Sequence, residues 1–273
     1  MEQSQALQMP SGSNLFTVAT YNVNSIRARM HIVIPWLKQH QPSVLCMQET
    51  KVVDADFPRA AFEEAGYFVV FRGQKSYNGV AVASRLPIQE VQYGFQDGED
   101  TPEDQARLIA CVINGVRIVN TYVPQGREIT DSMFQYKLKW FERLNSLFSR
   151  WVSREPLLWC GDLNVAPEPM DVYDPDGLKN HVCFHEDVRR AFHAVKALGL
   201  VDIFRKFNQE PKQYTFYDYR FPKSVERVKG WRIDHILANE SLAVRATGCY
   251  IDMEPRLAEK PSDHTVLAAV FDV

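Results

Sequence analysis

The stretch PLLWCGDLN, residues 156–164, places a carboxylate and an amide where an apolar run typical of a buried strand ends. Side chains alternate between the two faces of a strand, so Asp162 and Asn164 share one side while Leu163 points to the other. A buried charge needs a partner, a metal ion or water. Gly, Asp and Asn are also favoured in ordinary turns, so this stretch alone leaves a turn and a functional site open.

Similar polar groups occur at the ends of other predicted strands. SVLCMQE ends in Glu49, WRID ends in Asp234, TYNV contains Asn22, and PSDH, with Asp263 and His264, precedes the last strand. Acids at strand ends of an α/β fold commonly meet in one crevice. Glu49, Asp162 and Asp263 offer oxygen ligands, which suit Mg2+ or Mn2+ better than zinc. The expected substrate of such a site is a nucleic acid or another phosphate ester.

The elements that must position these residues are short β-rich runs alternating with helical patterns. Strands are predicted over 16–23, 43–49, 67–71, 79–84, 107–113, 116–123, 156–164, 232–238, 246–251 and 264–273. Apolar spacing predicts helices over 132–153, over 188–198 and over 26–37, the last with Pro35 in its first turn or at a kink. No repeat or linker divides the chain. The pattern predicts an N-terminal tail over 1–14 and one α/β domain over 15–273, with two packed sheets covered by helices.

Composition narrows the class of protein. The 273 residues are 45% hydrophobic and 24% charged, as in ordinary globular proteins. The first fifteen residues resemble neither a secretory signal nor a transit peptide, and no apolar run approaches membrane-spanning length. We therefore expect an intracellular, cytoplasmic protein without membrane contact. The five cysteines are scattered and form no C-x-x-C pair, which predicts free thiols in a reducing compartment.

The net charge of −3 conceals two charged runs. DGEDTPED, residues 97–104, is acidic and is interpreted as a solvated loop. RFPKSVERVKGWR, residues 220–232, is a predicted loop with five basic residues and one acid. The basic residues are Arg220, Lys223, Arg227, Lys229 and Arg232. Basic loops usually serve only solubility, so this run alone does not identify a nucleic-acid binder.

Several motifs resemble those of one family in sequence and in order. They are TYNVNSIRAR, LCMQETKV, TYVPQG, GDLNVAPEPMD, YTFYDYR, GWRID and EKPSDH, and they span nearly everything after the tail. The family is the exonuclease III family of abasic-site endonucleases, within the endonuclease/exonuclease/phosphatase superfamily. GDLN or SDH alone marks only the superfamily, whereas QETK, YVPQG and GWRID together are specific to its DNA-repair branch.

This resemblance implies a fold and an activity. The fold is a four-layered α/β sandwich, with two mixed β-sheets packed together and flanked by helices. The activity is metal-dependent incision of duplex DNA 5′ to abasic sites by a monomer, with 3′–5′ exonuclease or 3′-end-cleaning activity. The substrate is double-stranded DNA with abasic sites or blocked 3′ ends, and the cofactor is Mg2+, for which Mn2+ substitutes.

The resemblance also implies roles for matching residues. Glu49 is the expected metal ligand, aided by Asn22 and, through water, by Asp263. Asp162 is expected to position or deprotonate the attacking water, and Asn164 to hold that water in line. These roles suit phosphoryl transfer, which needs charge neutralisation and alignment more than covalent help.

The phosphate contacts implied by the resemblance include a histidine that is paired with an aspartate. His264, oriented by Asp234, is expected to bond a phosphate oxygen, and Tyr122 is expected to touch the same phosphate. Further expected phosphate contacts are Gln125, Arg220 and Lys229, together with Arg27, Arg72 and Lys75.

Three apolar residues have two interpretations. By residue type, Phe216, Trp231 and Ile233 are core residues. The resemblance instead implies that they form an apolar pocket for a flipped-out abasic sugar, and Trp231 and Ile233 share one strand face. A small dry pocket admits a sugar that lacks its base and excludes an intact nucleotide.

Four histidines are expected to have no catalytic role. His235 follows Asp234, but alternation sends it to the opposite face, which predicts a packing or surface role. His181, His185 and His193 lie in or before a helical pattern without ligand spacing.

Two alternative functions remain open. Another phosphodiesterase or phosphatase of the superfamily shares the acids and His264, but deoxyribonuclease-I-like members carry a second histidine in the loop that here reads YVPQG. A catalytically silent DNA- or RNA-binding relative is the other alternative. The complete set of expected ligands argues against it.

Overall fold

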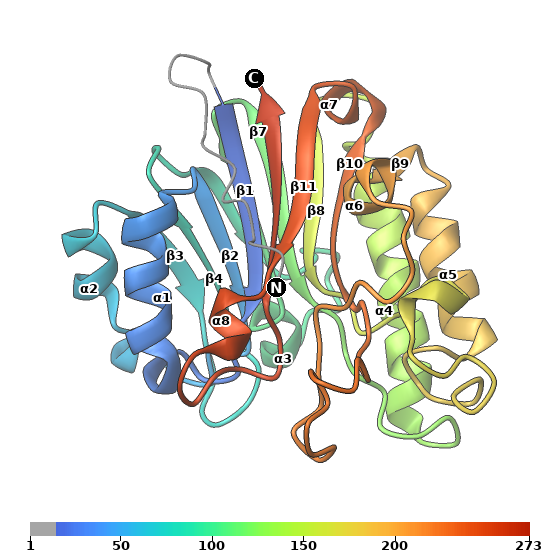
Figure 1. Ribbon diagram of the computed structural model, residues 1–273. Coiled ribbons are helices and arrows are strands. Elements are labelled where there is room, and N and C mark those ends of the chain that lie inside the picture. Colours follow the sequence, from blue (N-terminus) through green and yellow to red (C-terminus); the bar gives the residue numbers. More distant parts are fainter. Residues whose placement is uncertain (1–14) are drawn as a thin grey trace.

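The computed structural model describes residues 15–273; the expected tail of residues 1–14 lies outside the described residues. The strands are β1 (Leu15–Asn22), β2 (Val44–Gln48), β3 (Phe68–Arg72), β4 (Val80–Ser84), β5 (Gln89–Tyr93), β6 (Leu108–Ile113), β7 (Val116–Tyr122), β8 (Leu157–Asp162), β9 (Leu200–Asp202), β10 (Asp234–Asn239), β11 (Ala246–Asp252) and β12 (Val266–Asp272). They form two six-stranded sheets, ordered β11-β12-β1-β2-β4-β3 and β5-β6-β7-β8-β10-β9. The sheets pack face to face between outer helices, which confirms the predicted four-layered α/β sandwich (Figure 1).

Helices cover the outer face of each sheet (Figure 1). The helices of the described residues are α1 (Ile26–His40), α2 (Arg59–Glu64), α3 (Pro102–Gln105), α4 (Ser132–Ser149), α5 (Glu186–Lys196), α6 (Ile203–Phe207), α7 (Glu240–Ala243) and α8 (Glu254–Leu257), with short 3-10 turns at Asp54–Asp56 and Pro169–Asp171. Side chains of α6 and α7 pack in the core between the sheets. Apolar side chains of α1 and α2 pack on the first sheet, and those of α4 and α5 pack on the second.

Strand alternation divides the core into layers. In β8, Leu157 and Trp159 face α4 and α5, whereas Leu158 and Cys160 face the other sheet. All four side chains are fully buried. A strand buried on both faces reads as a continuous apolar run, and the polar residues that end β8 therefore mark the edge of the core.

The pairing of neighbouring strands brings the polar strand ends together. β1 runs parallel to β2 and β7 runs parallel to β8, so the carboxyl ends of each pair lie at one edge. Tyr122 pairs with Asp162 across β7 and β8. Asp234 also pairs with Asp162, but β10 is antiparallel to β8, so Asp234 begins its strand and does not end one as predicted.

Some predicted elements differ from the observed ones. Strands β5 and β9 were not predicted, because β5 is largely polar and half-exposed and β9 has three residues. Helix α4 ends at Ser149, four residues before the predicted end. Pro35 lies inside α1, so the first of its two predicted placements, in the first turn, is wrong, and the predicted kink stays a prediction.

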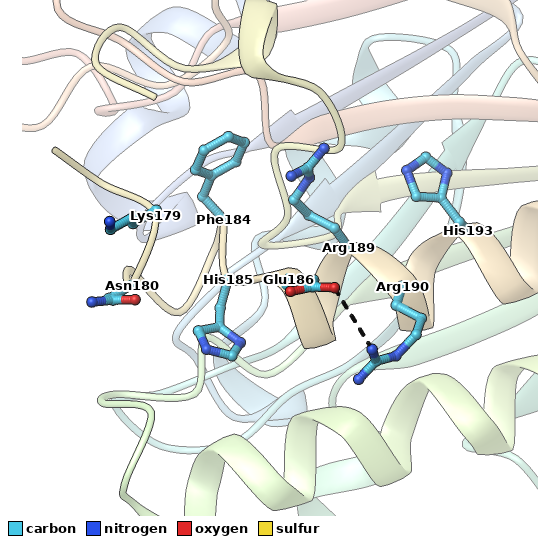
Figure 2. A pocket seen from close by; sticks show the side chains of 8 residues that line it. All are labelled: Lys179, Asn180, Phe184, His185, Glu186, Arg189, Arg190 and His193. Atoms are coloured by element: carbon cyan, nitrogen blue, oxygen red, sulfur yellow. Dashed lines mark ion pairs between the residues drawn. The ribbon is translucent and has the colours of Figure 1, made fainter. Parts of the chain in front are cut away.

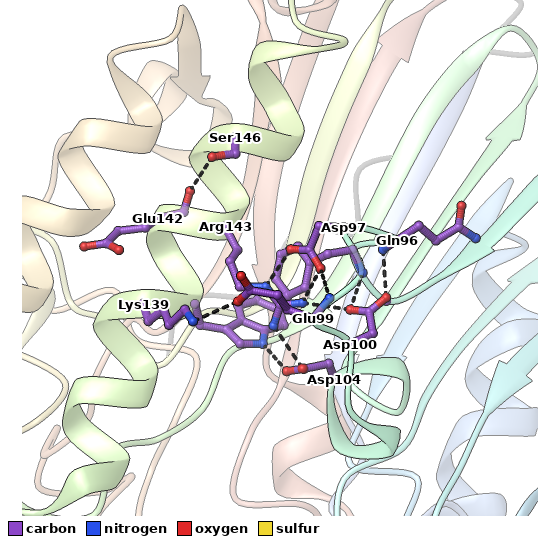
Figure 3. A network of polar contacts seen from close by, with 12 residues as sticks. Gln96, Asp97, Glu99, Asp100, Asp104, Lys139, Glu142, Arg143 and Ser146 are labelled. Atoms are coloured by element: carbon purple, nitrogen blue, oxygen red, sulfur yellow. Dashed lines mark hydrogen bonds and ion pairs between the residues drawn. The ribbon is translucent and has the colours of Figure 1, made fainter.

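The acidic run DGEDTPED is not a freely solvated loop. Arg143, from α4, pairs with Asp97, Asp100 and Asp104 at 2.8, 2.9 and 2.9 Å (Figure 3). Asp104 is buried and also accepts a hydrogen bond of 3.0 Å from the Trp140 indole. The solvated-loop interpretation was wrong for Asp104, because a buried carboxylate persists only when charged and polar donors surround it.

Arg232 was grouped with the solvent-facing basic loop, and this interpretation was also wrong. Its side chain is fully buried and pairs with Asp171 at 2.8 Å and with Asp202 at 2.8 Å. The Arg232 guanidinium also lies 3.0 Å from Nδ1 of His235, which is buried. The packing role expected for His235 is confirmed.

The expectation of free thiols is confirmed for Cys46, Cys111, Cys160, Cys183 and Cys249. Within residues 15–273, no helix has the length and apolar character needed to cross a bilayer.

The Arg232 network predicts an acid-sensitive contribution to stability. Burial alone raises the pKa of Asp171, but Arg232 and Arg205 outweigh burial and lower the pKa to about 2. Because this pKa lies below the unfolded value, the carboxylate stabilises the fold above pH 4, and the contribution is lost as pH falls through about 2. We expect Asp171→Asn to lower the free energy of unfolding by about 2 kcal/mol at pH 6, a deficit that shrinks between pH 4 and pH 2. Urea unfolding across this range measures it.

Asp56→Asn is the control, because Asp56 is exposed and should show almost no deficit at any pH. A deficit for Asp171→Asn that stays constant across the pH range contradicts the assignment.

Candidate active site

The predicted site residues gather around one cavity of about 490 Å³ at the polar edge of both sheets. Its lining includes Glu49, Tyr122, Gln125, Asp162, Asn164, Phe216, Arg220, Trp231, Ile233, Asp263 and His264. Asn22 and Asp234 lie behind this lining: Asn22 is hydrogen-bonded to Glu49 and Asp162, and Asp234 is hydrogen-bonded to His264. Lys229 is exposed and is not among the lining residues.

Asn22 holds two carboxylates together. Its Nδ2 donates to Oε1 of Glu49 at 2.7 Å and to Oδ2 of Asp162 at 2.9 Å. Asn22 is fully buried, and its Oδ1 accepts from the backbone N–H of Asn24. Asn22 therefore organises the carboxylates in this structure, and its expected role as a metal ligand stays a prediction.

Glu49 lies directly after β2 in a left-handed backbone conformation, with a φ of 51°. This conformation is uncommon for residues other than glycine, so the chain around Glu49 must stabilise it. The Lys51 ammonium lies 2.8 Å from Oε2 of Glu49. Burial alone raises the pKa of Glu49, but Lys51 and Asn22 outweigh burial and lower it, so Glu49 is ionised.

The donor set fits a divalent cation. Carboxylate oxygens of Glu49 and Asp162 lie within 4.8 Å of each other and of a His264 ring nitrogen, so the two carboxylates can converge on one cation. Asp263 lies in the same cavity, where its Oδ1 accepts from Nδ2 of Asn24 at 3.0 Å. A cavity rich in carboxylate oxygens is suited to a hard cation.

Asp162 and Asn164 are fixed by a tight backbone turn. Oδ1 of Asp162 accepts from the N–H of Asn164 at 3.0 Å, and Asn164 has a φ of 48°. The Asn164 amide donates to the Val123 carbonyl at 2.9 Å. Burial, with the nearby Asp234 and Glu49 carboxylates, raises the pKa of Asp162 above its usual range. A carboxylate with this increased proton affinity can act as a general base.

His264 is paired with Asp234, thirty residues upstream, as predicted. Nδ1 of His264 lies 2.8 Å from Oδ2 of Asp234, and Nε2 lies 3.7 Å from Oδ2 of Asp162. Burial alone lowers the pKa of His264, but Asp234 and Asp162 outweigh burial and raise it to about 10. His264 is therefore an imidazolium at neutral pH, and its Nε2–H can donate to an anion.

The three apolar residues form one wall of the cavity. Phe216 forms backbone bridges to both Trp231 and His264, so the wall is joined to the histidine. Trp231 and Ile233 are buried in the core beside α4 and α5, and Phe216 is half-buried. The structure thus places all three beside the acids, although they also serve as core residues.

The expected phosphate contacts differ in their surroundings. Gln125 lines the cavity. The Arg220 side chain is 85% exposed, but its guanidinium forms an ion pair of 2.6 Å with Asp218, which reduces its free charge. Arg27 and Lys75 are exposed, and Arg72 pairs with Asp54 at 3.4 Å.

Sequence reasoning missed part of the cavity wall. His181, Tyr173, Leu178 and Cys183 also line it. The His181 ring lies 4.6 Å from the Trp231 ring, and burial lowers the pKa of His181 to about 4, so the imidazole is neutral. These residues lie in the long segment between Asn164 and α5, where no periodic pattern indicated their direction.

His185 and His193 lie in a separate hollow of about 710 Å³ beside α5 (Figure 2). His185 caps α5 by accepting from the N–H of Asp187. Glu186 is the single acid among the described residues that line this hollow, and it pairs with Arg190. The hollow therefore lacks the converging carboxylates of the strand-end cavity.

Comparisons with known proteins agree with this geometry. The sequence model of the Endonuclease/Exonuclease/phosphatase family matches residues 19–264. Exodeoxyribonuclease III of Haemophilus influenzae is 32% identical over 266 residues, which cover 92% of this chain and 98% of the relative. An exodeoxyribonuclease of Bacillus subtilis is 30% identical and covers 82% of this chain and 88% of the relative.

Solved structures show the same likeness. An AP endonuclease from Archaeoglobus fulgidus is 54% identical, with a TM-score of 0.91 over 94% of this chain and all of that one. A 3′–5′ exonuclease from Neisseria meningitidis is 36% identical, with a TM-score of 0.91 over the same shares. The chain therefore belongs to the endonuclease/exonuclease/phosphatase family and, within it, to the exonuclease III-type AP endonucleases, which are phosphodiester-hydrolysing nucleases of DNA repair.

Proposed function

We propose that this protein incises duplex DNA 5′ to abasic sites and also processes 3′ ends as an exonuclease or an end-cleaning enzyme. The observation that carries the proposal is the cavity itself, where Glu49, Asp162 and His264 converge beside an apolar wall. The archaeal AP endonuclease supports the first activity, and a 3′ phosphatase from Neisseria bound to a product DNA hairpin, 36% identical, supports the second. A single catalytic domain over 15–273, a monomer and an intracellular location belong to the same proposal.

The proposed cofactor is Mg2+, with Mn2+ as a substitute. Glu49 is its proposed ligand, with Asn22 and, through water, Asp263. When bound, the ion supplies positive charge that neutralises the scissile phosphate. Oxygen donors predominate among these residues, which favours a hard cation over zinc.

Each active-site residue has a separate proposed role in the reaction. Asp162 accepts a proton from the attacking water, whose position is set by Asn164. The His264 imidazolium donates to a phosphate oxygen, and Asp234 holds the ring and stabilises its charge. Burial raises the pKa of Tyr122 well above its usual range, so its hydroxyl stays protonated and donates to the same phosphate. Hydrolysis breaks the bond between phosphorus and the 3′ oxygen and leaves a 3′ hydroxyl.

The apolar wall is proposed to select the substrate, and the basic loop is proposed to bind the DNA backbone. Phe216, Trp231 and Ile233 are proposed to receive the flipped-out abasic sugar. Gln125, Arg220 and Lys229 are proposed to contact backbone phosphates, which adds affinity without sequence preference.

A nicking assay on duplex DNA with one abasic site tests the proposed reaction. We expect incision 5′ to the site with Mg2+ or Mn2+ and none in EDTA, because the phosphate charge is then not neutralised. Asp162→Asn should bind the duplex normally but turn over about 100-fold more slowly or worse, because the proton acceptor is removed. Full activity in EDTA, or normal cleavage by Asp162→Asn, contradicts these assignments.

His264 and Asp234 should contribute to the rate as one unit. His264→Ala and Asp234→Ala should each lose most activity, and the double variant should lose less than the product of the two separate fold-losses, because Asp234 acts through His264. Single-turnover rates at saturating enzyme are compared for wild type, the two single variants and the double variant. His235→Ala serves as the control and should retain the rate once its folding is confirmed, because its side chain faces Arg232. Independent, multiplicative losses would show that Asp234 and His264 act separately.

The apolar wall and the basic loop should have separable effects. Trp231→Ala should lower the ratio of abasic to intact-duplex incision, because it enlarges the pocket without touching the reacting phosphate. Lys229→Ala should weaken binding to all duplexes and leave that ratio almost unchanged, with a salt dependence flatter by up to about one unit of slope. Both ratios are measured at matched salt on protein verified as folded. Equal effects on the ratio would assign Trp231 to the core alone.

A further inference from the structure

A fully buried lysine lies behind the active site on α4. Lys137 occupies the inward face of the helix between Phe134 and Phe141, where apolar residues otherwise pack on the second sheet. Its Nζ donates to three backbone carbonyls, those of Gln125 at 3.1 Å, Asn164 at 2.6 Å and Val182 at 2.7 Å. An ammonium group has three donors, so this arrangement satisfies all of them.

The placement of Lys137 is costly for the fold. Burying an ammonium group is unfavourable unless a partner compensates, and within residues 15–273 no carboxylate oxygen lies within 4.0 Å of its Nζ. Burial lowers the pKa of Lys137, which reports the same cost. An apolar side chain would continue the buried face of α4 without this penalty. The role of the lysine is therefore to hydrogen-bond the three carbonyls.

Each of the three carbonyls belongs to a different part of the cavity wall. Gln125 lies in the segment after β7 and Asn164 in the segment after β8, and both line the cavity. Val182 lies between His181 and Cys183, which also line it. One ammonium group thus links three wall segments that are distant in the sequence.

The local backbone is shaped around this link. Gly126 has a φ of 98°, and a Cβ there would lie 3.3 Å from Cδ of Lys137, so the segment after β7 wraps closely around the lysine stem. Asn164 has a left-handed φ of 48°. Its N–H is held by Asp162 and its carbonyl by Lys137, so both of its peptide groups are fixed.

We propose that Lys137 is a positioning residue of the active site, which sets the Asn164 amide, Gln125 and the 181–183 wall in reactive geometry by binding their carbonyls together. Lys137 does not line the cavity and touches no reacting atom. The inference rests on the hydrolytic function proposed above. A displacement of a catalytic group by about 1 Å costs on the order of 100-fold in rate, so the loss of this link should be visible in kcat.

The test compares kcat and KM of Lys137→Met with those of wild type in steady-state assays at saturating Mg2+. Methionine fills similar volume but donates to none of the carbonyls. We expect kcat to fall about tenfold or more, with a smaller change in KM, because the reacting groups are misplaced while most DNA contacts remain. In an Asn164→Ala background, Lys137→Met should cost about twofold or less, because the residue through which it acts is gone.

Lys139→Met is the matched control. Lys139 lies on the same helix, is 60% exposed and pairs with Glu99, so its loss should leave kcat unchanged. Lys137→Arg restores a charged donor and should recover part of the rate lost in Lys137→Met. If Lys137→Met does not fold, Lys137→Leu, which also donates to none of the carbonyls, is measured against the same criteria.

A folded variant without a donor at this position, Lys137→Met or Lys137→Leu, with kcat within twofold of wild type overturns the proposal. A full loss that persists in the Asn164→Ala background also overturns it, because the lysine would then act independently of Asn164. If wild type does not incise abasic duplex, the abasic-site part of the proposed function fails, and the Lys137 comparison is made on 3′-end removal from intact duplex. The two failures are therefore distinguishable.

Discussion

The amide of Asn22 is the contact on which the active site depends, because it joins the two sheets at their polar edge. Asn22 and Glu49 come from the first sheet and Asp162 comes from the second, so the distance between the carboxylates is set by sheet packing. A second link, from Gln48 to Asn120 at 2.7 Å, crosses the same interface. An aspartate in place of Asn22 would remove both donors and add a third charge, so an amide is required between two acids.

Much of the fold could be predicted because hydrophobic pattern and sheet topology agree. Buried strands such as β8 read as apolar runs, and the amphipathic stripe of α4 is long enough to be unambiguous. Strands β5 and β9 could not be predicted, since pairing with a neighbour, and not their own composition, makes them strands. The ion pair of Asp104 could not be predicted for a similar reason, because its partner Arg143 lies 39 residues away in the sequence.

The site was predictable where residue types report chemistry directly. Acids at strand ends indicated the cavity, and the resemblance to a family paired His264 with Asp234 across thirty residues. His181 was expected to have no role at the site, and its place in the cavity wall could not be predicted because an irregular segment without periodicity sets its direction. Lys137 escaped notice because one lysine on an apolar stripe is usually interpreted as a residue that reaches solvent with its charged end. Only the folded chain shows that three carbonyls surround it.

The segment that carries Trp231 and Ile233 has two faces with different structural roles. The cavity face is apolar, while Arg232 on the opposite face is anchored by Asp171 and Asp202. Because the Arg232 anchorage does not depend on residues 231 and 233, apolar exchanges that conserve their volume can change the cavity face while the segment stays anchored. Such a division makes substrate range evolvable, since new lesion preferences can arise by exchange of wall residues while the hydrolytic machinery stays in place.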